Sequence, residues 1–377
     1  MNIYSFKSEM IYQNDDALNF ADVSNDGRYL ALNKSHTRDN SDMYLYDVQS
    51  GNLNHISNHE GNVNFNPSSF SVDSKSLYFL TDKDSEFKYL QKYIIADGTI
   101  IEIQKEEWDI WYSYFSHSGR YRVTGINADS QTEIEVFDYE KNRPVRLPQL
   151  PAGSISSVSI SKSEKYMALY HGSAKSPSDL YLLDVESKKY QKLTNAMNPD
   201  VNPEYLGNAK VIRFKSFDGL EIPAVYYKPP NASSKNRVPA IVKVHGGPGG
   251  QARVGYRAST QYLVNHGYAV LDINNRGSNG YGKTFQTLDD QAHGEGDLDD
   301  CVWAMNWLKK QKHVDGDKIG ILGGSYGGYM VMAALAFRPD AFDVGVNLFG
   351  VTNWVRTLKS IPPWWEAMRE SLYKEMG

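Results

Sequence analysis

A polar turn that leads into an alternating strand occurs four times in the first half of the chain. The turns begin at Ser24, Ser71, Ser116 and Ser161, which lie 47, 45 and 45 residues apart. The first reads Ser24-Asn-Asp-Gly-Arg-Tyr-Leu-Ala-Leu, and the others share its pattern. A repeat in the mid-forties that contains only strands and turns is typical of β-propeller blades. The alternative is a β-sandwich in which the equal spacing is fortuitous.

The pattern changes after Pro203, where short apolar runs begin to alternate with helix-like segments. Strands are expected at 240–244, 268–272, 319–323 and 344–349, and a helix at 297–310. Alternating strands and helices predict a mostly parallel sheet covered on both faces. A chain of 377 residues is also long for a single core. We therefore expect a partial propeller of about four blades at 1–205 and an α/β domain at 206–377.

Ser325 stands between glycines at the junction of an apolar strand and an apolar helix. The sequence Gly323-Gly-Ser-Tyr-Gly-Gly-Tyr-Met330 has the Gly-x-Ser-x-Gly pattern of a nucleophile elbow, a turn too sharp for large side chains. Ser325 is the predicted nucleophile for acyl transfer. The N–H of Tyr326 is one predicted oxyanion donor. The second is expected in His245-Gly-Gly-Pro, with Gly247 preferred over Gly246, while His245 itself is expected to support this loop.

These motifs, together with Asn275-Arg-Gly-Ser-Asn-Gly-Tyr-Gly282 and Ile361-Pro-Pro-Trp-Trp365, resemble the prolyl oligopeptidase family. The similarity is greatest to its acylaminoacyl-peptidase and dipeptidyl-peptidase branches. It implies a propeller that covers an α/β-hydrolase domain, and a serine peptidase that cleaves short peptides through an acyl-enzyme on Ser325. It also implies that Tyr329, Trp364 and Trp365 lie near the pocket for the residue before the cut bond.

Two of these implied roles have structural alternatives. Trp364 and Trp365 could instead be packed in the core. Arg276 could orient the loop beside the site or bind a substrate carbonyl, or it could belong to a buried structural ion pair.

The sequence departs from the family pattern in its catalytic triad. The family places an aspartate after the seventh strand of the sheet and a histidine after the eighth, whereas 344–349 is the sixth expected strand. All nine histidines lie at or before His313, and Asp340 and Asp343 precede the sixth strand. We therefore expect a chain truncated at both ends, without its last strands and with little or no turnover. A carboxylesterase and a non-catalytic propeller that binds a ligand are the alternatives.

Charge and composition restrict the possible partners. The net charge of −5 and the isoelectric point near 6.0 give no electrostatic footprint for nucleic acid or for an anionic membrane. No apolar run approaches the length of a membrane span. The single cysteine, Cys301, fits a reducing compartment and a cytoplasmic location. No metal-spaced Cys or His cluster and no phosphate loop is found, so neither metal nor cofactor is expected. The expected partner is a short peptide substrate, and a homo-oligomer is possible.

Overall fold

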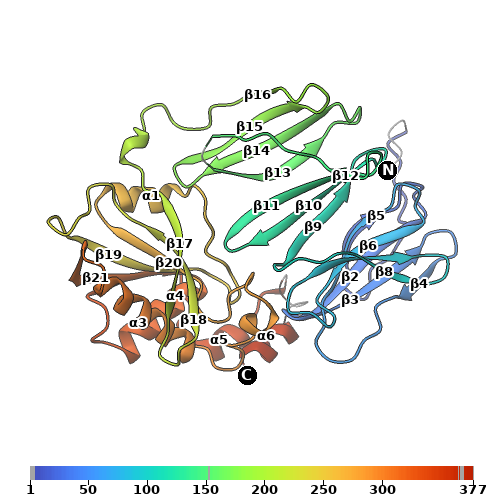
Figure 1. Cartoon of the computed structure of the whole chain (residues 1–377). Coiled ribbons are helices and arrows are strands. Elements are labelled where there is room, and N and C mark those ends of the chain that lie inside the picture. The colour runs from blue at the N-terminus through green and yellow to red at the C-terminus, as the bar shows by residue number, and fades with distance from the viewer. Residues whose placement is uncertain (1–4, 152, 364, 366–368, 377) are drawn as a thin grey trace.

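The computed structural model describes residues 5–151, 153–363, 365 and 369–376. Four antiparallel sheets follow one another in an arc, coloured from blue to green in Figure 1, beside a domain of strands and helices coloured from yellow to red. We call these parts the propeller domain and the α/β domain. None of the helices in the described part of the chain is long and apolar enough to cross a membrane.

Each sheet of the propeller domain has four strands, and each strand pairs with the next in sequence. The first sheet contains β1 (Asn19–Val23), β2 (Tyr29–Thr37), β3 (Asn40–Asp47) and β4 (Asn52–His55). The second contains β5 (Phe65–Phe70), β6 (Ser76–Thr81), β7 (Tyr89–Ile94) and β8 (Ile100–Gln104). The third contains β9 (Ile110–Phe115), β10 (Tyr121–Ala128), β11 (Gln131–Asp138) and β12 (Arg143–Pro144). The fourth contains β13 (Ser154–Ile160), β14 (Tyr166–Ser173), β15 (Ser176–Asp184) and β16 (Tyr190–Lys192).

The repeated serine of the sequence closes the turn between the first two strands of a sheet. Ser24 Oγ donates to Asp26 Oδ1 at 2.6 Å and accepts the N–H of Tyr29 at 2.8 Å. Ser71 Oγ makes the same contacts with Asp73, at 2.6 Å, and with the N–H of Ser76, at 3.0 Å. The side chain thus satisfies backbone groups that the tight turn would leave unpaired. The repeat predicted from the sequence corresponds to these four sheets.

The α/β domain has one six-stranded sheet in the order β17-β18-β20-β19-β21-β22. Its strands are β17 (Ala209–Lys215), β18 (Glu221–Tyr227), β19 (Val238–Val244), β20 (Ala269–Ile273), β21 (Val314–Gly324) and β22 (Val344–Leu348). β18 pairs antiparallel with β17 and β20, and the remaining pairs are parallel. The predicted mostly parallel sheet is confirmed. The predicted boundary after residue 205 stays a prediction, since a connection that includes a 3₁₀ turn, Pro203–Tyr205, joins β16 to β17.

Helices cover both faces of this sheet. On one face, α3 (Gly296–Lys309) and α4 (Tyr326–Phe337) pack on a large apolar core with residues such as Leu271 and Ile321. On the other face, Val264 of α1 (Ala258–Asn265) joins a smaller cluster that includes Ala174 of the propeller domain. The short helices α5 (Trp354–Lys359) and α6 (Arg369–Met376) lie outside these two layers (Figure 1), and a further short helix, α2 (Lys283–Gln286), follows β20 in the chain.

The strand β22 lies at the end of the sheet and is poorly covered. Its apolar side chains Val344, Val346 and Leu348 are 58%, 44% and 44% exposed. An apolar groove of about 610 Å³ runs along the same region, between Tyr262 of α1 and the strands β21 and β22. Parallel sheets are ordinarily buried on both faces, so β22 is an unusual outer strand.

Polar contacts join the two domains around residues 277–291. The Arg38 guanidinium, from the β2–β3 turn, donates to Asp289 Oδ1 at 3.1 Å and also binds Asp290. Glu86 accepts the N–H of Thr284 at 2.7 Å. The Ser130 and Tyr281 hydroxyls are 2.7 Å apart. These contacts hold the loops of the α/β domain against the propeller domain.

Leu77→Ala should lower the free energy of unfolding by about 2–5 kcal/mol, because Leu77 in β6 is fully buried and its loss leaves a cavity. Urea denaturation followed by circular dichroism measures the change. The control is Ile101→Ala in β8, where the side chain is 39% exposed, and it should cost below about 1 kcal/mol. Equal losses in the two variants would contradict the assigned packing.

Candidate active site

Ser325 occupies the turn between β21 and α4 with an unusual backbone conformation. Its φ of 55° and ψ of −120° lie where non-glycine residues are rarely found. The Ser325 N–H donates to the Leu348 carbonyl at 3.0 Å, and its own carbonyl accepts the N–H of Tyr329 at 3.0 Å. A serine held in a sharp strand-to-helix turn has the geometry of a nucleophile elbow.

Two glycines make this turn sterically possible. A Cβ on Gly323 would lie 2.2 Å from the carbonyl oxygen of Gly327. A Cβ on Gly327 would lie 2.2 Å from the carbonyl oxygen of Val244, at the end of β19. Both separations are far below van der Waals contact. The strand, the helix and β19 can therefore meet only where these side chains are absent.

Ser325 is exposed at a cavity of about 430 Å³. The cavity is lined by the ends of β19, β21 and β22, by the 245–252 loop and by the start of α1. Ser325 Oγ has no hydrogen-bond partner among the described residues. The hydroxyl is therefore available to a reactant that enters this cavity.

The predicted oxyanion donors lie beside the elbow. Tyr326 is the first residue of α4, where a backbone N–H has no intrahelical partner. Gly246 lies against Ser325, since a Cβ on Gly246 would be 3.4 Å from Ser325 Cβ. Gly247 follows with φ of 151° in a tight turn. In the described part of the chain, the backbone N–H groups of Gly246 and Gly247 donate no hydrogen bond. Their roles toward a substrate stay predictions.

His245 supports the loop, as the sequence predicts. Its Nε2 lies 2.8 Å from Ser278 Oγ, and its Nδ1 lies 2.9 Å from the Gly246 carbonyl oxygen. Burial lowers the pKa of this imidazole. Because one ring nitrogen contacts Gly246 and the other contacts Ser278, His245 is not oriented to accept the proton of Ser325.

Arg276 lies in an ion pair. Its guanidinium contacts Asp300 Oδ1 at 2.9 Å and Asp218 Oδ2 at 3.0 Å, and it stacks on the ring of Phe217. The Asp300 side chain is fully buried. Of the two alternatives for Arg276, these contacts favour the structural ion pair, since the guanidinium is already occupied by carboxylates.

The aromatic residues predicted to lie near the substrate, Tyr329, Trp364 and Trp365, do not share one environment. Tyr329 is half-buried, donates to the His293 carbonyl at 3.1 Å and packs edge-on against Trp354, with ring centroids 5.4 Å apart. Trp365 is 45% exposed. Trp364 lies outside the described residues. Contact of any of the three with a substrate stays a prediction.

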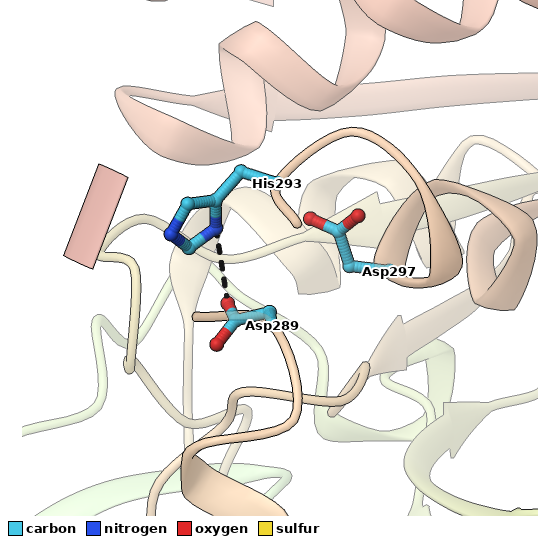
Figure 2. Close-up of side chains that lie close together, drawn as sticks. All are labelled: Asp289, His293 and Asp297. Atoms are coloured by element: carbon cyan, nitrogen blue, oxygen red, sulfur yellow. Dashed lines mark ion pairs between the residues drawn. The ribbon is translucent and has the colours of Figure 1, made fainter. Parts of the chain in front are cut away.

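Three buried titratable residues, Asp289, His293 and Asp297, form a cluster next to Tyr326, and Figure 2 shows their side chains pointing toward one another. The Tyr326 hydroxyl donates to Asp297 and lies 2.8 Å from His293 Nδ1. Nδ1 also lies 3.3 Å from Asp289 Oδ2. Burial raises the pKa of Asp297 to about 6. Burial alone would lower the pKa of His293, but the adjacent Asp289 carboxylate raises it.

The sequence pattern did not identify this cluster. From the sequence alone, His293 near a helix start is expected to have a surface or structural role, and Asp297 is one of the acidic residues common in a first helical turn. A signal was present, because Asp297, Cys301 and Leu308 lie on one face of α3. That spacing places the Asp297 carboxylate on the buried side.

Taken together, a propeller domain, a mixed sheet covered by helices and a serine in an elbow define the class of propeller-capped α/β-hydrolase folds. Residues 7–196 match the family model for the prolyl oligopeptidase N-terminal β-propeller domain, and residues 254–376 match the model for the prolyl oligopeptidase family. The chain belongs to the prolyl oligopeptidase family.

Several known proteins are similar to this chain in sequence or in fold. Dipeptidyl aminopeptidase BIII of Pseudoxanthomonas mexicana is 28% identical over 82% of this chain and 46% of its own length. The prolyl endopeptidase of Elizabethkingia meningoseptica is 24% identical, over 89% of this chain and 47% of that protein. A puromycin-hydrolyzing peptidase of Mycobacterium tuberculosis has a similar fold, with a TM-score of 0.83 at 19% identity, over 98% of this chain and 57% of that one. This chain thus spans about half the length of these relatives.

Gly323→Ala should lower the free energy of unfolding by about 1–3 kcal/mol, because the added methyl group collides with the Gly327 carbonyl. Gly324→Ala is the matched control, since its Cβ would meet no atom closer than 3.5 Å and should change stability little. Chemical denaturation of both variants measures the difference. A stable Gly323→Ala variant would refute the close approach at the elbow.

The lowered pKa of His245 predicts an acid-sensitive contribution to stability. Below the unfolded-state pKa, near 6.5, the unfolded chain takes up a proton that the folded chain resists, so this contribution is lost as the pH falls. Between pH 7.5 and 5.5, wild type should therefore lose more stability than His245→Gln. The exposed His117→Gln variant should follow wild type, and identical pH slopes for all three would contradict the prediction.

Proposed function

We propose that this protein is a serine peptidase that hydrolyses short peptides through an acyl-enzyme on Ser325. The observation that carries the proposal is the Ser325 hydroxyl, free at a cavity and fixed in an elbow conformation. Membership of the prolyl oligopeptidase family supports peptides as the substrate class. The propeller domain beside the cavity would restrict access to short chains.

The chemistry follows from the positions around Ser325. Ser325 Oγ attacks the peptide carbonyl carbon, and the negative charge develops on the carbonyl oxygen. The N–H groups of Tyr326 and Gly247, with Gly246 as the alternative loop donor, would stabilise that charge. The proton of the hydroxyl needs a base, and no histidine in the described part of the chain hydrogen-bonds to Ser325 Oγ. Tyr329, Trp364 and Trp365 are proposed to line the pocket for the residue before the cut bond.

We further propose that additional strands beside β22 complete the sheet and supply the triad aspartate and histidine. The exposed apolar side chains of β22 and the groove beside β21 support this proposal, because parallel sheets are covered on both faces. The share of its relatives that the chain spans supports it too. On this view the chain holds about four blades at 1–205 and an incomplete α/β domain at 206–377. A cytoplasmic location is proposed with it.

Residues 1–377 alone should therefore show little or no hydrolysis of dipeptidyl or aminoacyl chromogenic substrates. A longer chain with the completing strands should hydrolyse them, and Ser325→Ala should lower its kcat/KM by about 10⁴-fold or more, because the acyl acceptor is lost. Ser259→Ala, in the same cavity, is the matched control and should retain most activity.

Three outcomes would overturn parts of this proposal. Turnover by residues 1–377 that disappears in Ser325→Ala would show that a base is already present. A longer chain that cleaves esters but not peptides would identify a carboxylesterase. A longer chain that binds peptides without cleaving them would identify a binding module.

A further inference from the structure

The buried cluster of Asp289, His293 and Asp297 contains a carboxylate oxygen that accepts no hydrogen bond from the described residues. The side chains of Asp289, His293 and Asp297 are 1%, 4% and 0% exposed. One donor atom from each lies within 4.8 Å of the others (Figure 2). Asp289 Oδ2 has no hydrogen-bond partner among the described residues, although it is buried and faces the ring of His293. Its nearest positive group is the imidazole of His293, whose Nδ1 is 3.3 Å away, which is long for a charge-assisted hydrogen bond.

Each of the three side chains is oriented from behind by a second contact. Arg38 donates to Asp289 Oδ1 at 3.1 Å, while His293 faces the other oxygen, Oδ2. His293 Nε2 lies 3.1 Å from the Glu375 carbonyl oxygen, to which it must donate. Asp297 Oδ1 accepts the backbone N–H groups of residues 294 and 298 at 2.8 and 2.9 Å. Such outer contacts are typical of residues that ligate a metal, because they fix the tautomer and the direction of the lone pairs.

The tautomer has a direct consequence at the other ring nitrogen. With the proton on Nε2, a neutral His293 presents a lone pair at Nδ1. That lone pair faces Asp289 Oδ2 at 3.3 Å and the Tyr326 hydroxyl oxygen at 2.8 Å. The proton of this hydroxyl is donated to Asp297, so it also presents a lone pair to Nδ1. Two acceptors that face each other are repulsive unless a cation or a second proton lies between them.

The charged groups around the cluster also indicate that a cation binds there. Four carboxyl groups surround one guanidinium and one imidazole: Asp289, Asp290, Asp297 and Glu375 with Arg38 and His293. The Asp290 side chain is 33% exposed and can be solvated. Among the buried groups, three carboxylates face Arg38 and an imidazole that is neutral when it ligates a metal, so two negative charges remain. A buried excess of this kind must be neutralised by protons or by a cation. A divalent ion supplies the two missing charges.

We propose that Asp289 Oδ2, His293 Nδ1 and the carboxylate of Asp297 bind one zinc ion. Bonds of about 2.0–2.2 Å at a tetrahedral angle separate two ligand atoms by about 3.4 Å. The three ligand atoms all lie within 4.8 Å of one another, and the Nδ1–Oδ2 pair, at 3.3 Å, matches that value. One imidazole and two carboxylates suit zinc, whereas calcium requires six or more oxygen ligands. The proposal is independent of the proposed peptidase function.

Zinc here would connect three parts of the molecule. Asp289 contacts Arg38 of the propeller domain, Asp297 belongs to the first turn of α3, and the Tyr326 hydroxyl donates to Asp297. Tyr326 directly follows Ser325. The ion would therefore fix the side chain beside the elbow, and its role would be structural.

The test is a zinc titration of the full chain after removal of metal with a chelator. Roughly one zinc ion per chain should remain after desalting, and the apparent Tm should rise by about 5 °C or more at zinc concentrations far above Kd. His293→Gln and Asp297→Asn should each retain below about a tenth of an equivalent and show no rise in Tm. Two variants are used so that one remains informative if the other fails to fold.

Two controls separate this site from other places where zinc could bind. Asp290→Asn removes a neighbouring carboxylate that binds Arg38 but is not a proposed ligand, and it should retain zinc. His55→Gln removes a histidine from the group around Asp42 in the propeller domain, and it should also retain zinc. No bound zinc in wild type, or zinc retained in His293→Gln but lost in His55→Gln, would overturn the proposal. In the first case protons alone neutralise the cluster.

Discussion

The close approach of the backbone to itself between residues 323 and 327 is the constraint on which the rest of the site depends. It brings the start of α4 against the end of β19 without intervening side chains. Because β19 ends there, the 245–250 loop that follows it must pass directly beside Ser325. The cavity, the free hydroxyl and the unpaired loop N–H groups are consequences of this contact. Contacts with the substrate away from Ser325 would accelerate the reaction little if this geometry did not position the hydroxyl beside the peptide carbonyl.

The geometry of the site also depends on contacts between the loops of the α/β domain and the propeller domain. Residues 277–291 pack on the α/β domain through Phe285 and also bind propeller side chains such as Arg38 and Glu86. The same segment carries Asp289, whose carboxylate contacts His293, and His293 in turn contacts the Tyr326 hydroxyl. Packing of the two domains and the geometry beside Ser325 are therefore connected through a short series of buried polar contacts. Buried polar contacts of this kind favour a single arrangement of the two domains, because a buried polar group left without a partner costs free energy of folding.

Features encoded locally could be predicted from the sequence. The serine turns follow from Ser, Asp and Gly at fixed offsets, and the elbow follows from glycines around Ser325. The helix expected at 297–310 is observed as Gly296–Lys309. The cluster of Asp289, His293 and Asp297 could not be found in this way, because its members converge only when a loop and a helix pack together. The carboxylate partners of Arg276 also required the tertiary structure, since Asp300 lies 24 residues away.

The contact between Arg38 and Asp289 spans 251 residues of the chain. During synthesis, the strand that precedes Arg38 is complete long before its carboxylate partner exists. Pairings across such separations carry a large loop-closure entropy and form slowly. The four propeller sheets have only local pairings, so they can fold as a unit first. We infer that docking of the α/β domain onto the propeller is a late step of folding, and that the guanidinium of Arg38 stays hydrated until then.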